Sequence, residues 1–330
     1  MIVARRGRHP AAVTRPGPFR DGRPEPRSHG AAPSPVGGAA KEESVKQLTR
    51  RVATFGAATL ALAAAVLVGT GGTAQAIAAP VLVVNSSTGG SPVSDSATAT
   101  CPAGTSLVGT GGRIEQTVGS GNVVMTDVIP NVGAGTVTVW GHENGVYFGN
   151  WTVVAIAVCD QVLGPVLQVA ATSANNAVSP KSMTPFCPGA TRLTGLGYQL
   201  RGGNGQVFPN DIMPNGIIGS ILTAYASPGY AANWELTGYA LCAPVPAGAA
   251  PLIVANGSGP GVASPRDTWS GWCPAGTMLT GTGAELNNAF GNVIIDQMNP
   301  NAPITEAHAQ AAEPAPFGAP WGLVSYAICW

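Results

Sequence analysis

The sequence has few charged residues and few histidines, and this scarcity excludes several classes of protein. Lys, Arg, Asp and Glu make up 10% of the 330 residues, and there are four histidines. Most basic residues precede residue 77, where eleven Lys and Arg accompany four Asp and Glu. The rest of the chain keeps five Lys and Arg against twelve Asp and Glu, so it lacks the basic patch that binds nucleic acid.

Several motifs of catalytic and cofactor sites are also missing. There is no C-x2-C pair and no His pair at zinc-ligand spacing, so we expect no metal site. There is no G-x-S-x-G around a nucleophilic serine, and the run Gly109-Thr110-Gly111-Gly112 lacks the lysine of a phosphate-binding loop. We therefore expect no cofactor and no catalytic residue, and we assign these glycines to close backbone packing or to bulges.

Residues 1–44 differ in composition from everything that follows. They are rich in Arg, Pro and Gly and have almost no large apolar side chains, so they cannot bury a core. We interpret them as a disordered extension or as a start assigned too far upstream, with translation beginning at Val45.

Residues 45–76 have the order of segments found in a secretory signal peptide. A basic stretch precedes an apolar run from Val52 to Thr70, and the small-residue triplet Ala74-Gln75-Ala76 follows. A membrane-anchoring helix is the alternative, but the run contains two glycines and no basic stop-transfer segment follows it. We therefore expect cleavage after Ala76 and a secreted, extracellular protein without a membrane segment.

The remaining sequence contains three copies of one module. Each copy begins with C-P-x-x-T-x-L-x-G-x-G and closes with Trp-x7-Cys. An apolar segment that starts with proline precedes each copy, so the modules abut, and we place them at 77–162, 163–246 and 247–330. The opening cysteines are Cys101, Cys187 and Cys273, and the closing ones are Cys159, Cys242 and Cys329.

All six cysteines lie in these modules, and an even number in an exported chain indicates disulfides. A threefold repeat leaves two symmetric pairings. One joins the first and last cysteine of each module, as in 101–159, 187–242 and 273–329. The other joins the end of one module to the start of the next, as in 159–187. We favour the first, because each module then has its own crosslink.

Each module has the pattern of a series of short β-strands. Apolar and polar residues alternate, as in Thr152 to Val158, and Gly- and Asn-rich turns separate the runs. We expect five to six strands per module and little helix. An Asp-φ-φ-Pro-Asn element recurs with Asp127 and Asp211, and with one inserted residue after Asp296. We expect these carboxylates to accept backbone N–H groups before a Pro-Asn turn.

The recurrent tryptophans and one variable strand are the remaining candidates. Trp151, Trp234 and Trp321 each lie eight residues before a closing cysteine, so we assign them to the core beside the disulfide. One strand of each module has a small apolar face and a polar or aromatic face. Aligning these strands places the outward residues His142, Tyr225 and His308 at the same position. Together with Trp140 they are our candidate ligand-binding residues.

The module C-P-[AG]-x-T-x-L-x-G-x-G … Trp-x7-Cys resembles repeats of exported actinobacterial proteins that have no assigned activity. This resemblance covers residues 80–330 and implies no functional residues. The three C-P-x-G modules, each with an Asp 23–26 residues further on, are distantly similar to the vitelline membrane outer layer proteins, whose fold is a threefold β-prism. The Trp-x7-Cys closure and the missing D-D-T-A signature depart from that family, so it supplies a fold analogy alone.

The sequence therefore predicts an all-β protein with a threefold internal repeat. It is either a β-prism-like body with one sheet per module or three tandem β-sandwich modules, each stapled by a disulfide. We expect a secreted, non-catalytic binding or envelope-associated protein, with glycans or another cell-wall component as its ligand and aromatic side chains as its contacts. The alternatives are a hydrolase that uses Glu143 or Glu306 with a neighbouring Asp, and a purely structural extracellular protein. The sequence does not indicate an oligomeric state.

Overall fold

The computed structural model describes residues 79–161, 163–245 and 251–330, and these residues form 18 β-strands and no helix. The all-β prediction is confirmed, with six strands in each module. The predicted extension 1–44 and signal peptide 45–76 lie outside the described residues.

The strands of module 1 are β1 (Val81–Ser86), β2 (Ser94–Thr100), β3 (Ser106–Gln116), β4 (Val123–Asn131), β5 (Thr136–Glu143) and β6 (Trp151–Asp160). Those of module 2 are β7 (Leu167–Thr172), β8 (Lys181–Met183), β9 (Thr191–Arg201), β10 (Val207–Pro214), β11 (Ser220–Ala226) and β12 (Glu235–Pro244). Those of module 3 are β13 (Leu252–Gly257), β14 (Arg266–Trp269), β15 (Leu279–Asn287), β16 (Ile294–Pro300), β17 (Ala307–Ala312) and β18 (Gly322–Cys329).

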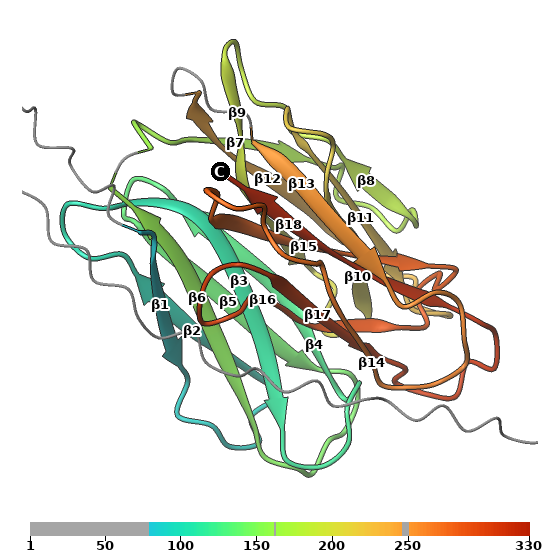
Figure 1. The fold of residues 1–330 in the computed structure, drawn as a ribbon. Helices are drawn as coiled ribbons and strands as arrows, with labels where there is room; N and C mark the ends of the chain where they lie inside the picture. Colours follow the sequence, from blue (N-terminus) through green and yellow to red (C-terminus); the bar gives the residue numbers. More distant parts are fainter. Residues whose placement is uncertain (1–78, 162, 246–250) are drawn as a thin grey trace, which may run out of the picture. The chain divides into compact units, whose positions relative to one another are not determined.

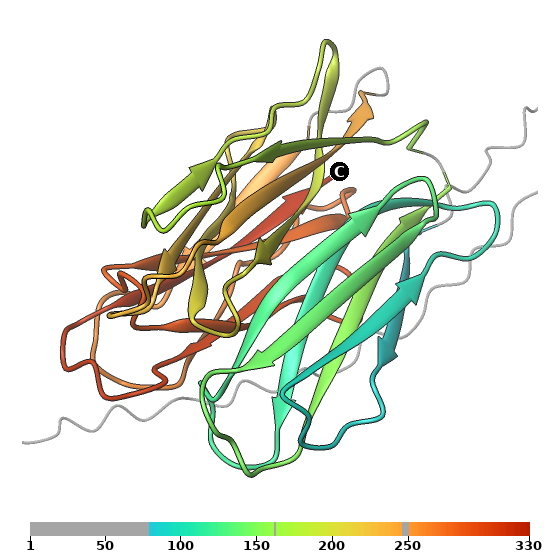
Figure 2. The ribbon, with the colours of Figure 1, turned by 180° about the vertical axis from the view of Figure 1, so that it is seen from behind.

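The strands form three six-stranded antiparallel sheets, and each sheet takes three strands from each of two modules (Figures 1 and 2). Sheet 1 has the order β1-β6-β3-β16-β17-β14, sheet 2 has β2-β5-β4-β9-β12-β7, and sheet 3 has β13-β18-β15-β10-β11-β8. Of the two architectures that the sequence left open, the one with a separate sheet for each module is therefore wrong in this detail. Each module is a small sandwich, as in contacts of β6 with β2 and β5, but its two halves belong to different sheets.

Neighbouring modules are joined at three seams, where the third strand of one module pairs with the fourth strand of another. The seams are β3–β16, β9–β4 and β15–β10, and Figure 1 shows β3 beside β16 although they are far apart in sequence. Each seam consists of two residue pairs, for example Gln297 opposite Arg113 and Met298 opposite Gly112. The pairing is cyclic, because each module shares one sheet with each of the other two modules.

Equivalent glycines let the third strands of the three modules approach closely. A Cβ atom on Gly195 would lie 2.7 Å from both Val108 O and Gly109 Cα, and one on Gly281 would lie 2.5 Å from Thr194 O. A Cβ on Gly109 would overlap Thr280 O. Each glycine thus faces the backbone of another module, and the predicted close packing is confirmed. The predicted bulges also occur here, because the register shifts between Leu107 and Gly109 and between Leu279 and Gly281.

The disulfides join Cys101 to Cys159, Cys187 to Cys242 and Cys273 to Cys329, so the pairing within modules is confirmed. Crosslinks that close loops of this size stabilise by about 3–4 kcal/mol each in the chain-entropy picture. Trp151, Trp234 and Trp321 are buried in the main core, as predicted. A second, smaller core consists of Val124, Phe208 and Ile294, one from the fourth strand of each module.

Candidate functional site

Two of the three core tryptophans donate their indole N–H to a glutamate eight residues earlier in the chain. Trp321 Nε1 lies 2.7 Å from Glu313 Oε1, and Trp151 Nε1 lies 3.4 Å from Glu143 Oε1. The equivalent residue of module 2 is Ala226, and Trp234 Nε1 has no hydrogen-bond partner among the residues that the structure describes. Glu143, one of the two carboxylates of the hydrolase alternative, is therefore a buried acceptor for a core tryptophan. The spacing Glu-x7-Trp is a signal that our sequence analysis missed.

Two of the tryptophans also carry a cation over the ring. Lys181 Nζ lies 4.6 Å from the centre of the Trp234 ring and donates to Trp234 O at 2.6 Å. Arg266 lies over Trp321 in the same way and donates to Trp321 O. Burial lowers the pKa of Lys181 below its ordinary value. These contacts join the two sheets that each of these modules contributes to. They use both cations, so neither is available for a ligand.

The aspartates of the Asp-φ-φ-Pro-Asn element lie at the seams. Asp127 Oδ1 accepts the backbone N–H of Leu200 at 2.8 Å, so the acceptor role is confirmed for Asp127, but the donor belongs to the neighbouring module. Burial raises the pKa of Asp127 to about 6, although the bonds from Leu200 and Thr126 oppose this shift. Burial likewise raises the pKa of Asp211.

Asp296 is not the equivalent of Asp127 and Asp211. When Pro130, Pro214 and Pro300 are superposed by register, Gln297 takes the place of the other two aspartates. Asp296 is instead the bulge residue, at the position of Thr126 and Asn210. The apparent insertion in the sequence is therefore a one-residue displacement of the aspartate.

The outward strands are β5, β11 and β17, and their alternation of buried and more exposed residues is as predicted. The alignment of their residues needs one correction. His142 lies opposite Val124 and Tyr225 opposite Phe208, whereas His308 lies opposite Asn299, one residue before Pro300. His308 therefore corresponds to Thr138 and Ile221, because the register follows the proline of the preceding strand.

The structure does not bring the four predicted binding residues together. Trp140 is 40% exposed on sheet 2, and His142 lies near it on β5 with Nδ1 against Glu143 O. Tyr225 lies on sheet 3, where its ring meets Phe290 of module 3 edge to face. His308 lies on sheet 1 and packs on Trp269. The four residues thus occupy three sheets.

Around His308, six side chains form a polar and aromatic surface that we call the Trp269 platform. It consists of two cross-strand rows on the outer face of β14, β17 and β16. The first row is Trp269, His308 and Asn299, and the second is Asp267, Gln310 and Gln297. Their neighbours on the three strands, such as Thr268, Ala309 and Met298, point into the core.

Trp269 is the exposed aromatic of this platform. It is 42% exposed, and its ring centroid lies 4.5 Å from that of His308 at a tilt of 36°. Burial lowers the pKa of His308, and the Asp267 carboxylate, whose Oδ2 lies 3.8 Å from His308 Nε2, opposes this effect. The imidazole is therefore mainly neutral at pH 7 and can both donate and accept a hydrogen bond.

The amide side chains complete the platform. Gln297 Nε2 donates to Gln310 Oε1, and Asn299 Oδ1 has no hydrogen-bond partner among the described residues. The equivalent face of module 2 carries Ser182, Ile221, Thr223 and Met213. That of module 1 carries Ser96, Thr138, Trp140 and Ile129, so among the described residues a Trp beside a His occurs at these positions in module 3 alone. The pairing of Trp269 with His308 was not predicted from the sequence.

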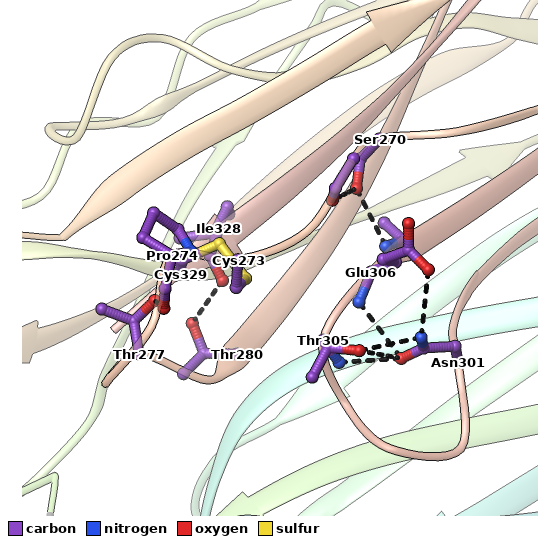
Figure 3. Close-up of a disulfide and its surroundings, with 12 residues drawn as sticks. Ser270, Cys273, Pro274, Thr277, Thr280, Asn301, Thr305, Glu306, Ile328 and Cys329 are labelled. Carbon is purple, nitrogen blue, oxygen red and sulfur yellow. Dashed lines mark hydrogen bonds between the residues drawn. A yellow bond between two sulfur atoms is a disulfide. The ribbon is translucent and has the colours of Figure 1, made fainter. Parts of the chain in front are cut away.

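Glu306, the other carboxylate of the hydrolase alternative, lies in the turn that follows Pro300. Asn301 Oδ1 accepts the N–H groups of Thr305 and Glu306, at 2.7 and 3.1 Å (Figure 3). Figure 3 also shows this turn beside the Cys273–Cys329 disulfide. The predicted Pro-Asn turn is confirmed here, and Glu306 has its backbone fixed by the asparagine.

Neither a metal cluster nor a membrane helix was found in the part of the chain that the structure describes. No three His, Cys, Asp or Glu side chains there lie close enough to hold a metal ion. Within the same residues, no helix is long and apolar enough to cross a membrane. Comparison with protein-family models gave no match, and comparison with curated proteins gave none either.

Proposed function

We propose that the protein is a secreted, non-catalytic binding protein and that its ligand is a glycan held on the Trp269 platform. The observation that carries this proposal is the exposed Trp269 in a row with a neutral His308 and an amide, next to the row of Asp267, Gln310 and Gln297. An exposed indole ring stacks on the apolar face of a sugar, and the surrounding amide, imidazole and carboxylate groups bond its hydroxyls. A structural protein has no need of this combination on one module only.

The three disulfides support an oxidising compartment, as in secreted proteins. The non-catalytic part of the proposal is supported by the two carboxylates of the rival reading. Glu143 bonds a core tryptophan, and the backbone of Glu306 is held in a turn by Asn301.

The test is a glycan array probed with the purified protein, followed by calorimetry on the strongest ligand. Trp269→Ala should weaken binding about tenfold or more, which is the effect of losing a stacked aromatic contact. Trp140→Ala is the matched control, because Trp140 is equally exposed but lies on sheet 2. It should leave the affinity within about twofold. An array without any signal, or equal losses in both variants, would refute the proposal.

A further inference from the structure

A small cavity lies at the seam of β3 and β16, next to the Trp269 platform. Its volume is about 190 Å³, and its walls include Glu115, Gln116, Ser120, Asp296, Gln297 and Gln310. Two of these residues, Gln297 and Gln310, also form the second row of the platform. Ligand pockets for whole small molecules are usually about 300–1,000 Å³, so this cavity is sized for one substituent of a ligand.

Asp296 is the residue that makes this cavity unusual. Its side chain is 2% exposed, and Oδ1 has no hydrogen-bond partner among the described residues. A buried carboxylate oxygen without a donor costs free energy, and native structures rarely keep one. Asp296 Oδ1 is therefore a buried acceptor that a hydrogen-bond donor of a ligand can satisfy.

The equivalent residue of module 2 shows which hydrogen bond this position makes when its side chain carries a donor. Asn210 Nδ2 donates to Leu286 O across the β10–β15 seam at 2.9 Å. By register, the strand residue opposite Asp296 in the same way is Ile114, which also lines the cavity. An ionised Asp296, unlike Asn210, has no hydrogen to donate to a backbone carbonyl across the seam.

The charges around the cavity favour a cation as the group that donates to Asp296. Arg113 Nε is bonded to Glu115 Oε1 at 2.8 Å, so these two charges balance each other. Asp296 then leaves the cavity with one net negative charge when it is ionised. A primary ammonium is compact and has three N–H donors, and Asp296, Glu115 and the glutamine amides offer it acceptors. Two carboxylates, one of them already paired, are too few for the oxygen shell of a divalent cation.

We propose that the seam cavity binds the primary ammonium group of an amino sugar whose ring lies on the Trp269 platform. This inference rests on the proposed function, and it narrows the ligand class from glycans in general to glycans with free amines. Burial raises the pKa of Asp296 to about 7, so the protonated and the ionised form are both populated at neutral pH. An ammonium in the cavity then stabilises the ionised form.

The test compares two ligands that differ only in the amine. A tetrasaccharide of β-1,4-linked glucosamine and its fully N-acetylated counterpart are titrated into the wild-type protein, Asp296→Asn and Asp211→Asn by calorimetry at pH 7. Asp296→Asn keeps the side-chain shape and introduces the amide found at Asn210, so it should fold. Asp211→Asn is the matched control, a seam aspartate on sheet 3 that is remote from the cavity in the sheet order.

The wild-type protein should prefer the free-amine ligand by about tenfold or more, which is typical of a charged hydrogen bond. Asp296→Asn should abolish this preference, and Asp211→Asn should retain it. Equal affinity for both ligands, or a preference that survives in Asp296→Asn, overturns the inference and leaves the proposed function standing.

If neither tetrasaccharide binds, the proposed function fails for this ligand class, and methylammonium chloride tests the cavity separately. Ligand-observed NMR should then detect methylammonium binding to the wild-type protein and its loss in Asp296→Asn. Absence of methylammonium binding to the wild-type protein would refute the ammonium site itself.

Discussion

Replacing Asp296 by Asn should stabilise the ligand-free protein, and the gain should depend on pH. The folded protein raises the pKa of this carboxyl from 3.8 to about 7 through burial. A raised folded-state pKa means that the protonated form is favoured by folding. Its stabilising contribution is fully present below pH 3.8 and is lost as the pH rises to about 7. The ionised carboxylate is therefore a cost to the folded protein at neutral pH.

The shift gives the size of the effect. At 1.36 kcal/mol per pKa unit, a rise of roughly three units corresponds to about 4 kcal/mol in full, of which about 3 kcal/mol falls between pH 4.5 and 7.5. Asn does not titrate, and its Nδ2 can donate across the seam as Asn210 does to Leu286 O. The stability difference between variant and wild type should therefore grow by about 3 kcal/mol over this range.

Urea unfolding at pH 4.5 and 7.5, with the disulfides intact, measures this difference. Because Asp127 and Asp211 are unchanged in the variant, their own titration cancels in the comparison. Asp267→Asn, an exposed carboxyl on the same sheet, serves as a control and should change stability by less than about 0.5 kcal/mol. A stability difference between Asp296→Asn and wild type that is the same at both pH values would refute the reasoning.

Two further predictions concern packing between and within modules. Gly195→Ala should cost about 3 kcal/mol or more in the free energy of unfolding, because its Cβ would lie 2.7 Å from backbone atoms of module 1. Gly133→Ala is the control, because the nearest atom to its Cβ would be Asn131 Oδ1 at 3.6 Å, and it should be nearly neutral in thermal unfolding. Ala226→Glu should add about 1 kcal/mol in urea unfolding by giving the Trp234 indole the acceptor that Glu313 gives Trp321, and an unchanged midpoint would contradict this.

The sequence repeat predicted the strands, the disulfides and the core tryptophans because each depends on residues within one module. Strand alternation and the cysteine spacing are local signals, and β5 follows them residue by residue. The glycines were predicted to pack closely because their run lacks the lysine of a phosphate-binding loop. What they contact was not predictable, because Gly195 touches the backbone of Val108 in another module.

The site was less predictable because it depends on register between strands. Our alignment compared the strands along the sequence without their register, so it misplaced His308 and treated Asp296 as equivalent to Asp127. The structure follows the prolines instead, since Pro300 has the same place in its strand pair as Pro130. The pairing of Trp269 with His308 joins β14 to β17, and no local pattern in the sequence specifies that contact.

The cyclic sharing of sheets fixes the number of modules at three. The third strand of module 1 finds its partner in module 3, so deleting module 3 would leave β3 and β10 as bare edges. Unpaired edges of this kind promote aggregation between chains. Solenoid proteins can gain or lose repeats one at a time because their ends stay open. In this protein each module pairs with both of the others, so the loss of any one module would break two of the three seams.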